Sequence, residues 1–253
     1  MAGPIAPIQA VLFDAAGTLL RVREPVGVTY ARIAARHGVE LPAQRLEDAF
    51  GRVLAAARPE PRAGEPLDEA QHRERAWWRE RVRETFRAAD GTARFADFEA
   101  FFSELFDHYA DAAAWQLLPG VPEALDGLAK QGLRLAVVSN FDQRLRPLLR
   151  ELGIHDSFEA VTLPADAGAA KPDRTIFDVC LKRLGVPAHR AVYVGEGARG
   201  DVQAAEAAGL LAMDVSGWPS LAALPGRVAT LELRRAAPPP AKLRPERRRR
   251  SGP

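Results

Sequence analysis

Short apolar runs that end in polar residues constrain the fold of this chain more than any other feature of its sequence. The run IQAVLFD at residues 8–14 indicates a buried strand, and the Asp-x-x-Gly that begins at its end indicates a tight turn. Segments with helical periodicity lie between the runs, and strands that alternate with helices indicate a parallel sheet covered on both faces. We therefore predict an α/β fold with a Rossmann-like parallel sheet. The other expected strands lie at residues 133–140, 159–163, 190–197 and 210–217.

Residues 22–113 interrupt this alternation, because they show helical patterns and no comparable strand. Their aromatic residues recur at helical spacing, as in the stretch from Phe98 to Tyr109 and in the stretch around Trp78. Such spacing is typical of side chains that pack together, so we assign these residues to the core of an all-helical insert. The predicted organisation is a core of residues 1–21 and 114–220, a helical insert at 22–113 and a C-terminal extension at 221–253.

The composition is that of a globular protein without disulfides. Hydrophobic residues make up 47% of the 253 residues, which is enough for a hydrophobic core. The only cysteine, Cys180, excludes an internal disulfide and a cysteine-rich zinc site. The sequence shows neither the pattern of a secretion signal nor an apolar run of membrane-spanning length. We therefore expect a soluble, cytoplasmic protein without a membrane partner.

The C-terminal tail differs from the rest of the chain in charge and composition. Residues 234–253 hold eight Lys or Arg and one Glu, which leaves a net charge of −5 on the remainder of a chain whose total is +2. The tail is rich in proline and nearly free of large apolar side chains, so it cannot bury enough surface to order itself. A basic tail can contact nucleic acid or another anionic partner. Its composition favours a solvated, disordered segment instead.

Polar residues stand at the ends of the predicted strands. Asp14, Ser139, Asn140 and Glu196 each end one of the apolar runs. In an open parallel sheet, ligands bind beyond the carboxyl ends of the strands, near the point where the strand order reverses. Taken singly, these residues have structural explanations, since Asp14 suits a turn and Ser139 suits a helix cap. Their joint occurrence at strand ends predicts one site.

Two further residues extend this set. Lys171 precedes the helix that follows the strand at 159–163, and it is one of only four lysines in a chain with 31 arginines. A lysine at this position is therefore less easily explained as an ordinary surface residue. Asp201 begins the helical pattern DVQAAEAAG, where an aspartate is also a common N-cap.

The segments FDAAGTLL, VVSN, AAKPD and YVGEGARGD resemble, in this order, the four motifs of the haloacid dehalogenase superfamily. The resemblance spans residues 8–217, and the insert at 22–113 is similar to the helical cap of subfamily I of that superfamily. The segments AWW and LRLAVVSNFDQRL are similar to one branch, whose members are predicted hydrolases. The resemblance implies hydrolase activity, but it supplies no substrate.

The residue types suit phosphoryl transfer, which depends mainly on positioning and on neutralisation of charge. A carboxylate at a strand end can attack phosphorus and form an aspartyl-phosphate, and Asp14 is the candidate nucleophile. We expect Ser139 and Lys171 to assist it, because a lysine offsets the repulsion between nucleophile and phosphate. The residues expected to hold the phosphate are Gly17, Thr18, Ser139, Asn140 and Lys171.

Magnesium is the expected cofactor. Asp14, Glu196 and Asp201 offer the hard oxygen ligands that Mg²⁺ prefers, with water completing the octahedron. The resemblance adds the backbone carbonyl of Ala16 as a further ligand. The expected partner is a small phosphorylated compound, and the sequence does not indicate an oligomeric state.

Two residues depart from the pattern of the superfamily's phosphatases. Ala16 stands where those enzymes carry a second Asp, which protonates the leaving oxygen and later activates water. Loss of general acid–base help typically lowers a rate by about 10²–10⁴. Glu196 stands where Asp is more usual, and its additional methylene shifts the metal or changes its contact. Both departures count against an efficient general phosphatase, and Ala16 indicates weakened acid–base chemistry.

Relatives that lack the second Asp suggest other reactions. Phosphonoacetaldehyde hydrolases use a lysine of the cap, and residues 22–113 contain no lysine. The 2-haloacid dehalogenases attack carbon without a metal, and Glu196 beside Asp14 would repel a haloacid carboxylate. Two hypotheses remain, a magnesium-dependent phosphatase and a non-catalytic protein that binds phosphate. The four motifs favour the enzyme.

Overall fold

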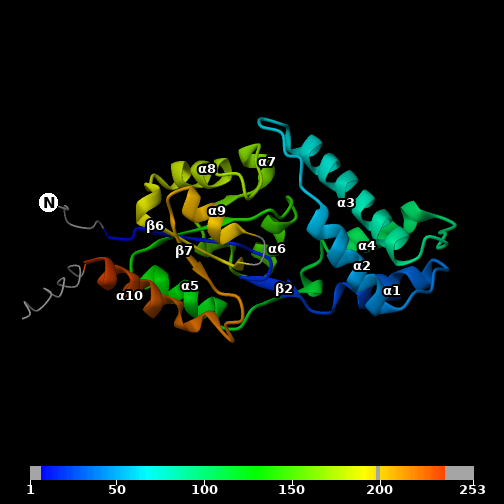
Figure 1. The fold of residues 1–253 in the computed structure, drawn as a ribbon, viewed down its shortest axis with the longest axis horizontal. Coiled ribbons are helices and arrows are strands. Elements are labelled where there is room, and N and C mark those ends of the chain that lie inside the picture. The colour runs from blue at the N-terminus through cyan, green and yellow to red at the C-terminus, as the bar shows by residue number, and fades with distance from the viewer. Residues whose placement is uncertain (1–6, 198–199, 237–253) are drawn as a thin grey trace, which may run out of the picture.

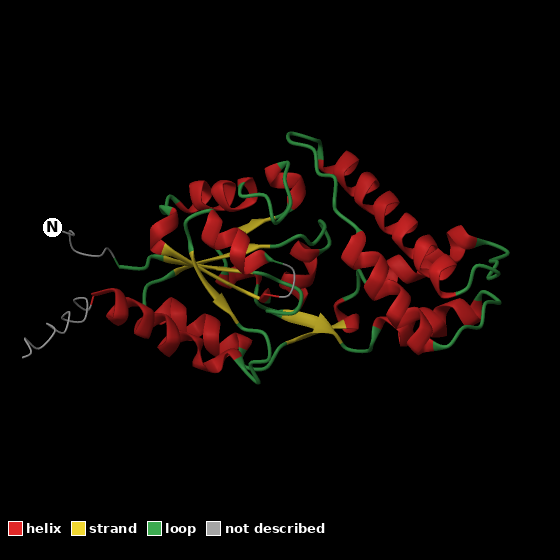
Figure 2. Cartoon of the chain, in the orientation of Figure 1, coloured by secondary structure: helices red, strands yellow, loops and turns green. Residues whose placement is uncertain are grey.

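The computed structural model describes residues 7–197 and 200–236, and a five-stranded parallel sheet forms its centre (Figures 1 and 2). The strand order is β5-β4-β1-β6-β7, and every neighbouring pair is parallel. The predicted α/β class with a Rossmann-like sheet is confirmed, and all five expected strands are present. They are β1 (Ala10–Phe13), β4 (Arg134–Val138), β5 (Ala160–Thr162), β6 (Ala191–Gly195) and β7 (Leu211–Asp214).

Helices cover both faces of the sheet, because successive side chains of a strand point to opposite sides. In β1, Ala10 and Leu12 pack among the side chains of α8 and α9, whereas Val11 and Phe13 pack among those of α5, α6 and α10. Figure 1 shows α8 on one side of the sheet and α5 with α10 on the other. These helices are α5 (Val121–Lys130), α6 (Leu145–Glu151), α8 (Thr175–Leu184), α9 (Asp201–Ala207) and α10 (Leu224–Ala236).

The insert forms a separate helical layer at the end of the molecule opposite α10 (Figure 1). Its aromatic side chains pack together, as predicted from their helical spacing. Tyr30 stacks on Phe86 with ring centroids 6.1 Å apart, and Phe86 meets the edge of Phe101 at 5.1 Å. We refer to this layer as the cap. Its helices are α1 (Val26–Arg36), α2 (Ala43–Ala56), α3 (Leu67–Ala89) and α4 (Phe98–His108).

A short antiparallel ribbon joins the cap to the core. It pairs β2 (Leu20–Val22) with β3 (Trp115–Leu117), so both chain crossings pass through the same small sheet. The sequence analysis did not predict this ribbon, because three residues are too few to display a strand period. The ribbon lies at the predicted limits of the insert, and it ties the two crossings together.

The chain beyond residue 220 contributes to the core. Leu221, Leu224 and Val228 are buried in the same cluster as the residues of α5. The extension predicted from residue 221 therefore begins as a part of the core, which is a correction to the predicted boundary. The tail predicted from residue 234 starts in the last turn of α10 and otherwise lies outside the described residues. The short remaining elements are η1 (Ala112–Ala114), η2 (His155–Ser157), α7 (Pro164–Ala167), η3 (Ala188–Arg190) and η5 (Leu221–Ala223).

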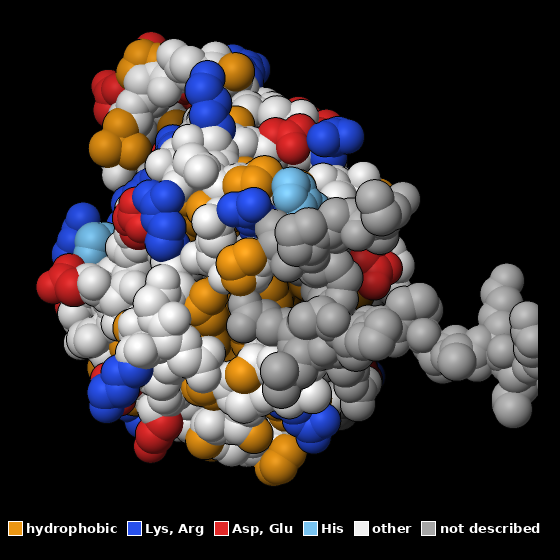
Figure 3. Space-filling model, turned by 90° about the vertical axis from the view of Figure 1, so that its left-hand side faces the viewer, with side chains coloured by type: hydrophobic (Ala, Val, Ile, Leu, Met, Phe, Trp, Pro, Cys, Tyr) orange, Lys and Arg blue, Asp and Glu red, His pale blue; other side chains and the backbone are white. Residues whose placement is uncertain are grey.

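The described surface shows mixed charge on the face that points away from the cap. In Figure 3, Lys and Arg side chains on that face are interspersed with Asp and Glu, and hydrophobic side chains lie near its middle. Within residues 7–197 and 200–236, no helix has the length and apolar character needed to cross a membrane.

Candidate active site

The register of the sheet brings the polar strand ends to one edge. Phe13 at the end of β1 pairs with Val137 of β4 and with Val194 of β6. The strand order runs outward from β1 in both directions, and a ligand crevice is expected at such a reversal. The residues that follow these pairs at the same edge are Asp14, Ser139, Asn140 and Glu196.

Lys171 lies at the centre of a buried cluster of charges at this edge. Its Nζ is 2.9 Å from Asp14 Oδ1 and 2.6 Å from Asp201 Oδ2. The same ammonium donates to the hydroxyl of Tyr193 at 2.9 Å. Only 3% of the Lys171 surface is exposed. The structure thus brings together Asp14, Lys171 and Asp201. In the sequence, Lys171 stands 157 positions after Asp14 and 30 positions before Asp201.

The two carboxylates keep Lys171 charged. Burial by itself would lower the pKa of the Lys171 ammonium, but the charges of Asp14 and Asp201 together with Tyr193 raise it well above its ordinary value. Burial, followed by the charge of Asp14, raises the pKa of the Tyr193 phenol. At neutral pH the cluster therefore holds an ammonium and an un-ionised phenol beside the candidate nucleophile.

Asn140 fixes the backbone of Lys171. The Asn140 side chain donates from Nδ2 to the carbonyl oxygen of Lys171 at 2.9 Å, and its Oδ1 accepts from the Lys171 N–H at 2.7 Å. The next peptide bond, between Lys171 and Pro172, is cis. Ser139 is buried, and its Oγ accepts from the N–H of Phe141 at 3.3 Å. The second and third motifs are therefore joined through Asn140.

The turn after Asp14 requires glycine at residue 17. Gly17 has a φ of +84°, and a Cβ built there would lie 2.5 Å from Glu196 Oε2. The Glu196 carboxylate therefore lies directly against the turn, which leaves no room for a side chain. The Gly17 N–H donates to the carbonyl of Leu20 at 2.8 Å, so the turn itself uses this donor.

Thr18 is placed differently from the other predicted phosphate-binding residues. Its side chain is fully buried, and its hydroxyl finds no hydrogen-bond partner among the described residues. The predicted role of Thr18 in holding phosphate therefore depends on its backbone and not on its hydroxyl.

Comparisons with known proteins establish the family of this chain. The sequence profile of the haloacid dehalogenase-like hydrolases matches residues 8–209. Haloacid dehalogenase-like hydrolase domain-containing protein 3 of Bos taurus is 34% identical over 211 residues, which cover 83% of this chain and 82% of that protein. The chain belongs to the haloacid dehalogenase-like hydrolase family. Its resemblance to a particular branch is confirmed as well, since the rhythmically expressed gene 2 protein of Drosophila melanogaster is 25% identical over 81% of this chain and 82% of that protein.

Solved structures show the same fold. A haloacid dehalogenase (HAD) phosphatase from Thermococcus onnurineus superposes with a TM-score of 0.58 and 23% identity, over 87% of this chain and 98% of that chain. CbbY from Rhodobacter sphaeroides, solved in complex with phosphate, superposes with a TM-score of 0.55 and 22% identity, over 84% of this chain and 88% of that chain.

The predicted magnesium ligands of this haloacid dehalogenase-like hydrolase lie at one edge of the sheet, where two of them contact Lys171. Asp14 and Asp201 each direct an oxygen at its ammonium. Within residues 7–197 and 200–236, no three His, Cys, Asp or Glu side chains are grouped as a metal site. The oxygens of Asp14, Glu196 and Asp201 suit Mg²⁺ by their chemistry. Magnesium therefore stays a prediction from residue type.

A pair of residues that the sequence analysis did not select holds the fourth motif. The Gly197 N–H donates to Asp214 Oδ1 at 3.1 Å and to Ser216 Oγ at 3.2 Å. Hydrogen bonds from the side chain and backbone of Ser216 hold the pKa of Asp214 below its ordinary value. Asp214 is the last residue of β7, so it could have been predicted in the same way as Asp14 and Glu196, as a polar residue at the end of a strand.

The cap touches the loop that follows β4. Trp78 of α3 donates from Nε1 to Asp142 Oδ2 at 2.6 Å, and Glu74 of α3 accepts from the Gln143 N–H at 3.0 Å. The prediction that placed Trp78 in the interior of the insert is thus only half correct, since Trp78 packs beside the aromatic cluster and also bonds to the core. These contacts join segments 64 and 69 residues apart, and no local pattern marks them.

A second contact joins the cap to the segment before Lys171. A Cβ built on Gly168 would lie 2.5 Å from the Cβ of Ala63, in the loop between α2 and α3. Gly168 has a φ of +65°, so both its conformation and this approach require glycine. The cap of this hydrolase therefore contacts the segment after the second motif and the residue before the third.

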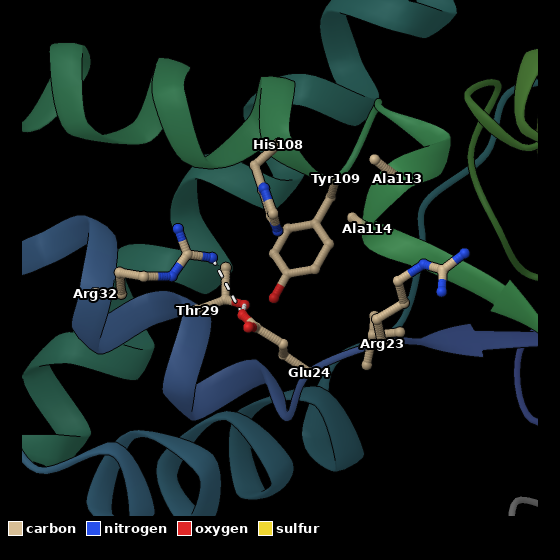
Figure 4. Close-up of a pocket in the computed structure, with 9 residues that line it drawn as sticks. Arg23, Glu24, Thr29, Arg32, His108, Tyr109, Ala113 and Ala114 are labelled. Carbon is tan, nitrogen blue, oxygen red and sulfur yellow. Dashed lines mark hydrogen bonds and ion pairs between the residues drawn. The ribbon is translucent and has the colours of Figure 1, made fainter.

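A cavity of about 200 Å³ lies beside the ribbon of β2 and β3 and apart from these motifs. Figure 4 shows Tyr109 and His108, at the end of α4, facing the pair that Glu24 and Arg32 form at 3.2 Å. Burial, and then the charge of Arg32, lowers the pKa of His108. None of the predicted site residues lines this cavity. We therefore keep the strand ends as the candidate active site.

Proposed function

We propose that this protein hydrolyses a small phosphorylated compound through an aspartyl-phosphate on Asp14. The observation that carries the proposal is the position of the Asp14 carboxylate, at the end of β1 and 2.9 Å from a buried ammonium. The family supports a hydrolase, and the phosphate bound to CbbY shows that a protein of this fold accommodates that anion.

The reaction follows from the groups at the strand ends. A carboxylate oxygen of Asp14 attacks phosphorus while the bond from phosphorus to the leaving oxygen breaks, which gives an acyl-phosphate and an alkoxide or phenoxide. Lys171 stabilises the negative charge that collects near the nucleophile. Water then hydrolyses the acyl-phosphate and releases inorganic phosphate. Ser139 and Asn140 hold the loop that faces the phosphoryl oxygens.

The residue at position 16 determines which substrates react well. The Ala16 side chain has no acidic proton to donate, so the leaving oxygen takes its proton from water. Phosphates with good leaving groups need little protonation, and we expect the protein to favour them. Loss of a general acid slows poor leaving groups by about 10²–10⁴.

Asp14, Glu196, Asp201 and the Ala16 carbonyl are the groups that would hold magnesium. When bound, the ion neutralises charge on the transferring phosphoryl group. The chain's own contribution is to place the nucleophile, to supply the Lys171 charge and to hold the motif loops through Asn140 and Asp214.

A second function is favoured by one observation. The absence of an acid at position 16 is also what a protein that binds phosphate without turnover would show. In that case the strand-end cluster would bind the anion, and no covalent intermediate would form.

One screen separates the two functions. The purified protein is incubated with a panel of phosphorylated metabolites and aryl phosphates, with and without magnesium, and released phosphate is measured. We expect turnover that Asp14→Asn removes, because an amide cannot form the acyl-phosphate. Asp126→Asn, an exposed change on α5, serves as the control and should keep full turnover. Phosphate binding without turnover would support the second function, and turnover that survives Asp14→Asn would contradict the proposed nucleophile.

A further inference from the structure

Helix α3 of the cap docks on residues 141–143, which immediately follow Ser139 and Asn140 and which we call the motif-two loop. Glu74 and Trp78 are one helical turn apart and lie on the same face of α3. Glu74 Oε2 accepts from the Gln143 N–H at 3.0 Å, and Trp78 Nε1 donates to Asp142 Oδ2 at 2.6 Å. Two consecutive residues of a motif loop are thus held by two residues of the cap.

The two carboxyl groups in this contact, Asp142 and Glu74, have different hydrogen-bond partners. The Arg144 guanidinium donates to both oxygens of Asp142, at 2.9 and 2.7 Å, the Arg144 backbone N–H donates at 3.0 Å, and Trp78 adds a fourth donor. Glu74 is half-buried, and it accepts a neutral backbone N–H while lying close to the charge of Asp142. Asp142 therefore has a cationic partner, whereas Glu74 has a neutral donor and a neighbouring carboxylate.

The charges that face Glu74 agree with this difference. Burial raises the pKa of Glu74 to about 7, and the charge of Asp142 adds to the increase. The Gln143 N–H opposes it, as do Arg73 on α3 and Arg144 beside the loop. Both arginines are engaged elsewhere, since Arg73 pairs with Glu65 at 2.5 Å and Arg144 pairs with Asp142.

We propose that Glu74 is a positioning residue that docks the cap on the motif-two loop when it is protonated and loosens this docking when it ionises. The strength of cap docking then depends on whether Glu74 is protonated, which changes near neutral pH. The proposal uses the proposed function in one respect, since it takes the motif-two loop to be the part of the core that holds phosphate. The contact between Glu74 and Gln143 does not depend on that function.

The direction follows from the pKa of Glu74 in its two environments. The ordinary value is 4.5 and the docked value is about 7, so the docked cap binds the proton more tightly. The stabilisation is complete below the ordinary value and is lost as the pH rises through 7. Between pH 6 and pH 8, the docking equilibrium falls by at most about tenfold, and by less where water screens the carboxylate.

The direct test follows the amide that bonds to Glu74. The ¹⁵N-labelled full-length protein, without substrate, is titrated from pH 5.5 to pH 8.5, and the Gln143 amide resonance is recorded. We expect it to shift with a midpoint near pH 7, and its protection from hydrogen exchange, corrected for the intrinsic rate, to fall by up to about tenfold between pH 6 and pH 8. Glu74→Gln should keep the hydrogen bond and abolish both changes.

A matched variant on the same helix serves as the control. Glu69→Gln removes an exposed carboxylate near the start of α3 and should leave the titration of Gln143 unchanged. A Gln143 amide that does not titrate between pH 6 and pH 8, or that titrates equally in Glu74→Gln, would overturn the proposal. This outcome is independent of turnover, so it is distinguishable from a failure of the proposed phosphatase function.

Kinetics give a second readout once a substrate is known. The pH profile of kcat/KM should lose a limb near pH 7 in Glu74→Gln, with the change in KM and not in kcat, because docking precedes the chemical step. If Glu74→Gln instead lowered kcat/KM equally at every pH, its role would be purely structural and the proposal would be contradicted.

Discussion

Two regions of the molecule hold charged side chains away from water: the edge of the sheet around Lys171, and the contact between α3 and the loop after β4. The charges are neutralised in different ways in the two regions. At the strand ends, the Lys171 ammonium lies within 2.9 Å of the carboxylates of Asp14 and Asp201. Where α3 meets the loop after β4, Asp142 forms an ion pair with Arg144, whereas Glu74 of α3 accepts a hydrogen bond from the neutral backbone amide of Gln143. One region thus fixes its charges, and the other contains a carboxyl whose charge depends on pH.

This difference means that pH near 7 affects the contact between the cap and the core but not the candidate active site. The pKa of Lys171 lies well above its ordinary value, so its charge does not change in the neutral range. The pKa of Glu74 is raised to about 7, so its charge changes there. A change in pH near 7 can therefore alter how the cap docks without altering the cation that assists the nucleophile. Substitutions in the two regions should separate accordingly.

The largest expected effect comes from removing the fixed cation. Lys171→Met leaves the buried Asp201 carboxylate and the largely buried Asp14 carboxylate without their partner, and breaking a buried pair in this way costs about 3–5 kcal/mol. We expect the free energy of unfolding, measured by urea denaturation at pH 7 with a chelator present, to fall by this amount. Turnover should disappear as well.

An exposed lysine provides the control for this variant. Lys130 pairs with Asp126 at 2.7 Å on the surface of α5, and such pairs contribute less than about 1 kcal/mol. Lys130→Met should therefore leave the urea midpoint nearly unchanged. Similar small losses for both lysines would break the comparison, because the strand-end charges would then not require compensation by Lys171.

A smaller effect is expected where the cap meets the core. Trp78→Phe keeps an aromatic ring at this position and removes the N–H that bonds to Asp142, and a hydrogen bond to a charged group contributes about 1.5–3 kcal/mol. The two guanidinium bonds from Arg144 remain, so we expect a loss near the lower end of this range in the free energy of unfolding.

The adjacent tryptophan sharpens this prediction. Trp77 donates to the carbonyl of Arg58 at 3.1 Å in an exposed position within the cap. Trp77→Phe should cost less than Trp78→Phe, and it should leave the resonances of the loop after β4 in place. A larger loss for Trp77→Phe would show that the bond between Trp78 and Asp142 does not hold the cap.

Much of the fold was predictable because its signals are local. Apolar runs four to eight residues long marked the strands, and helical spacing marked the aromatic core of the cap. The ribbon of β2 and β3 was missed because its strands are three residues long. The helix α10 was missed although Leu224 and Val228 stand four positions apart, since the basic tail that follows dominated the composition.

The candidate site was predictable only as far as its strand ends. Asp14 and Lys171 were found because the carboxyl edge of a parallel sheet gathers residues distant in sequence. Tyr193 was missed because alternation along β6 marks it only as a core residue. Glu74 was missed because its partner is a backbone amide 69 residues away, and neither residue type indicates such a contact.

The central claim is that this site keeps its nucleophile and cation but lacks a proton carrier at position 16. Ala16 is exposed beside the turn, so a carboxylate has room there. Turnover of alkyl and aryl phosphates is measured side by side for the wild type, for Ala16→Asp and for Ala16→Asn at saturating magnesium. We expect Ala16→Asp to accelerate alkyl phosphates by about 10²–10³ and aryl phosphates much less, because only poor leaving groups need protonation, and Ala16→Asn to do neither. Equal or lower turnover of alkyl phosphates in Ala16→Asp, with magnesium affinity preserved, would contradict the account and indicate a site built for another reaction or for binding alone.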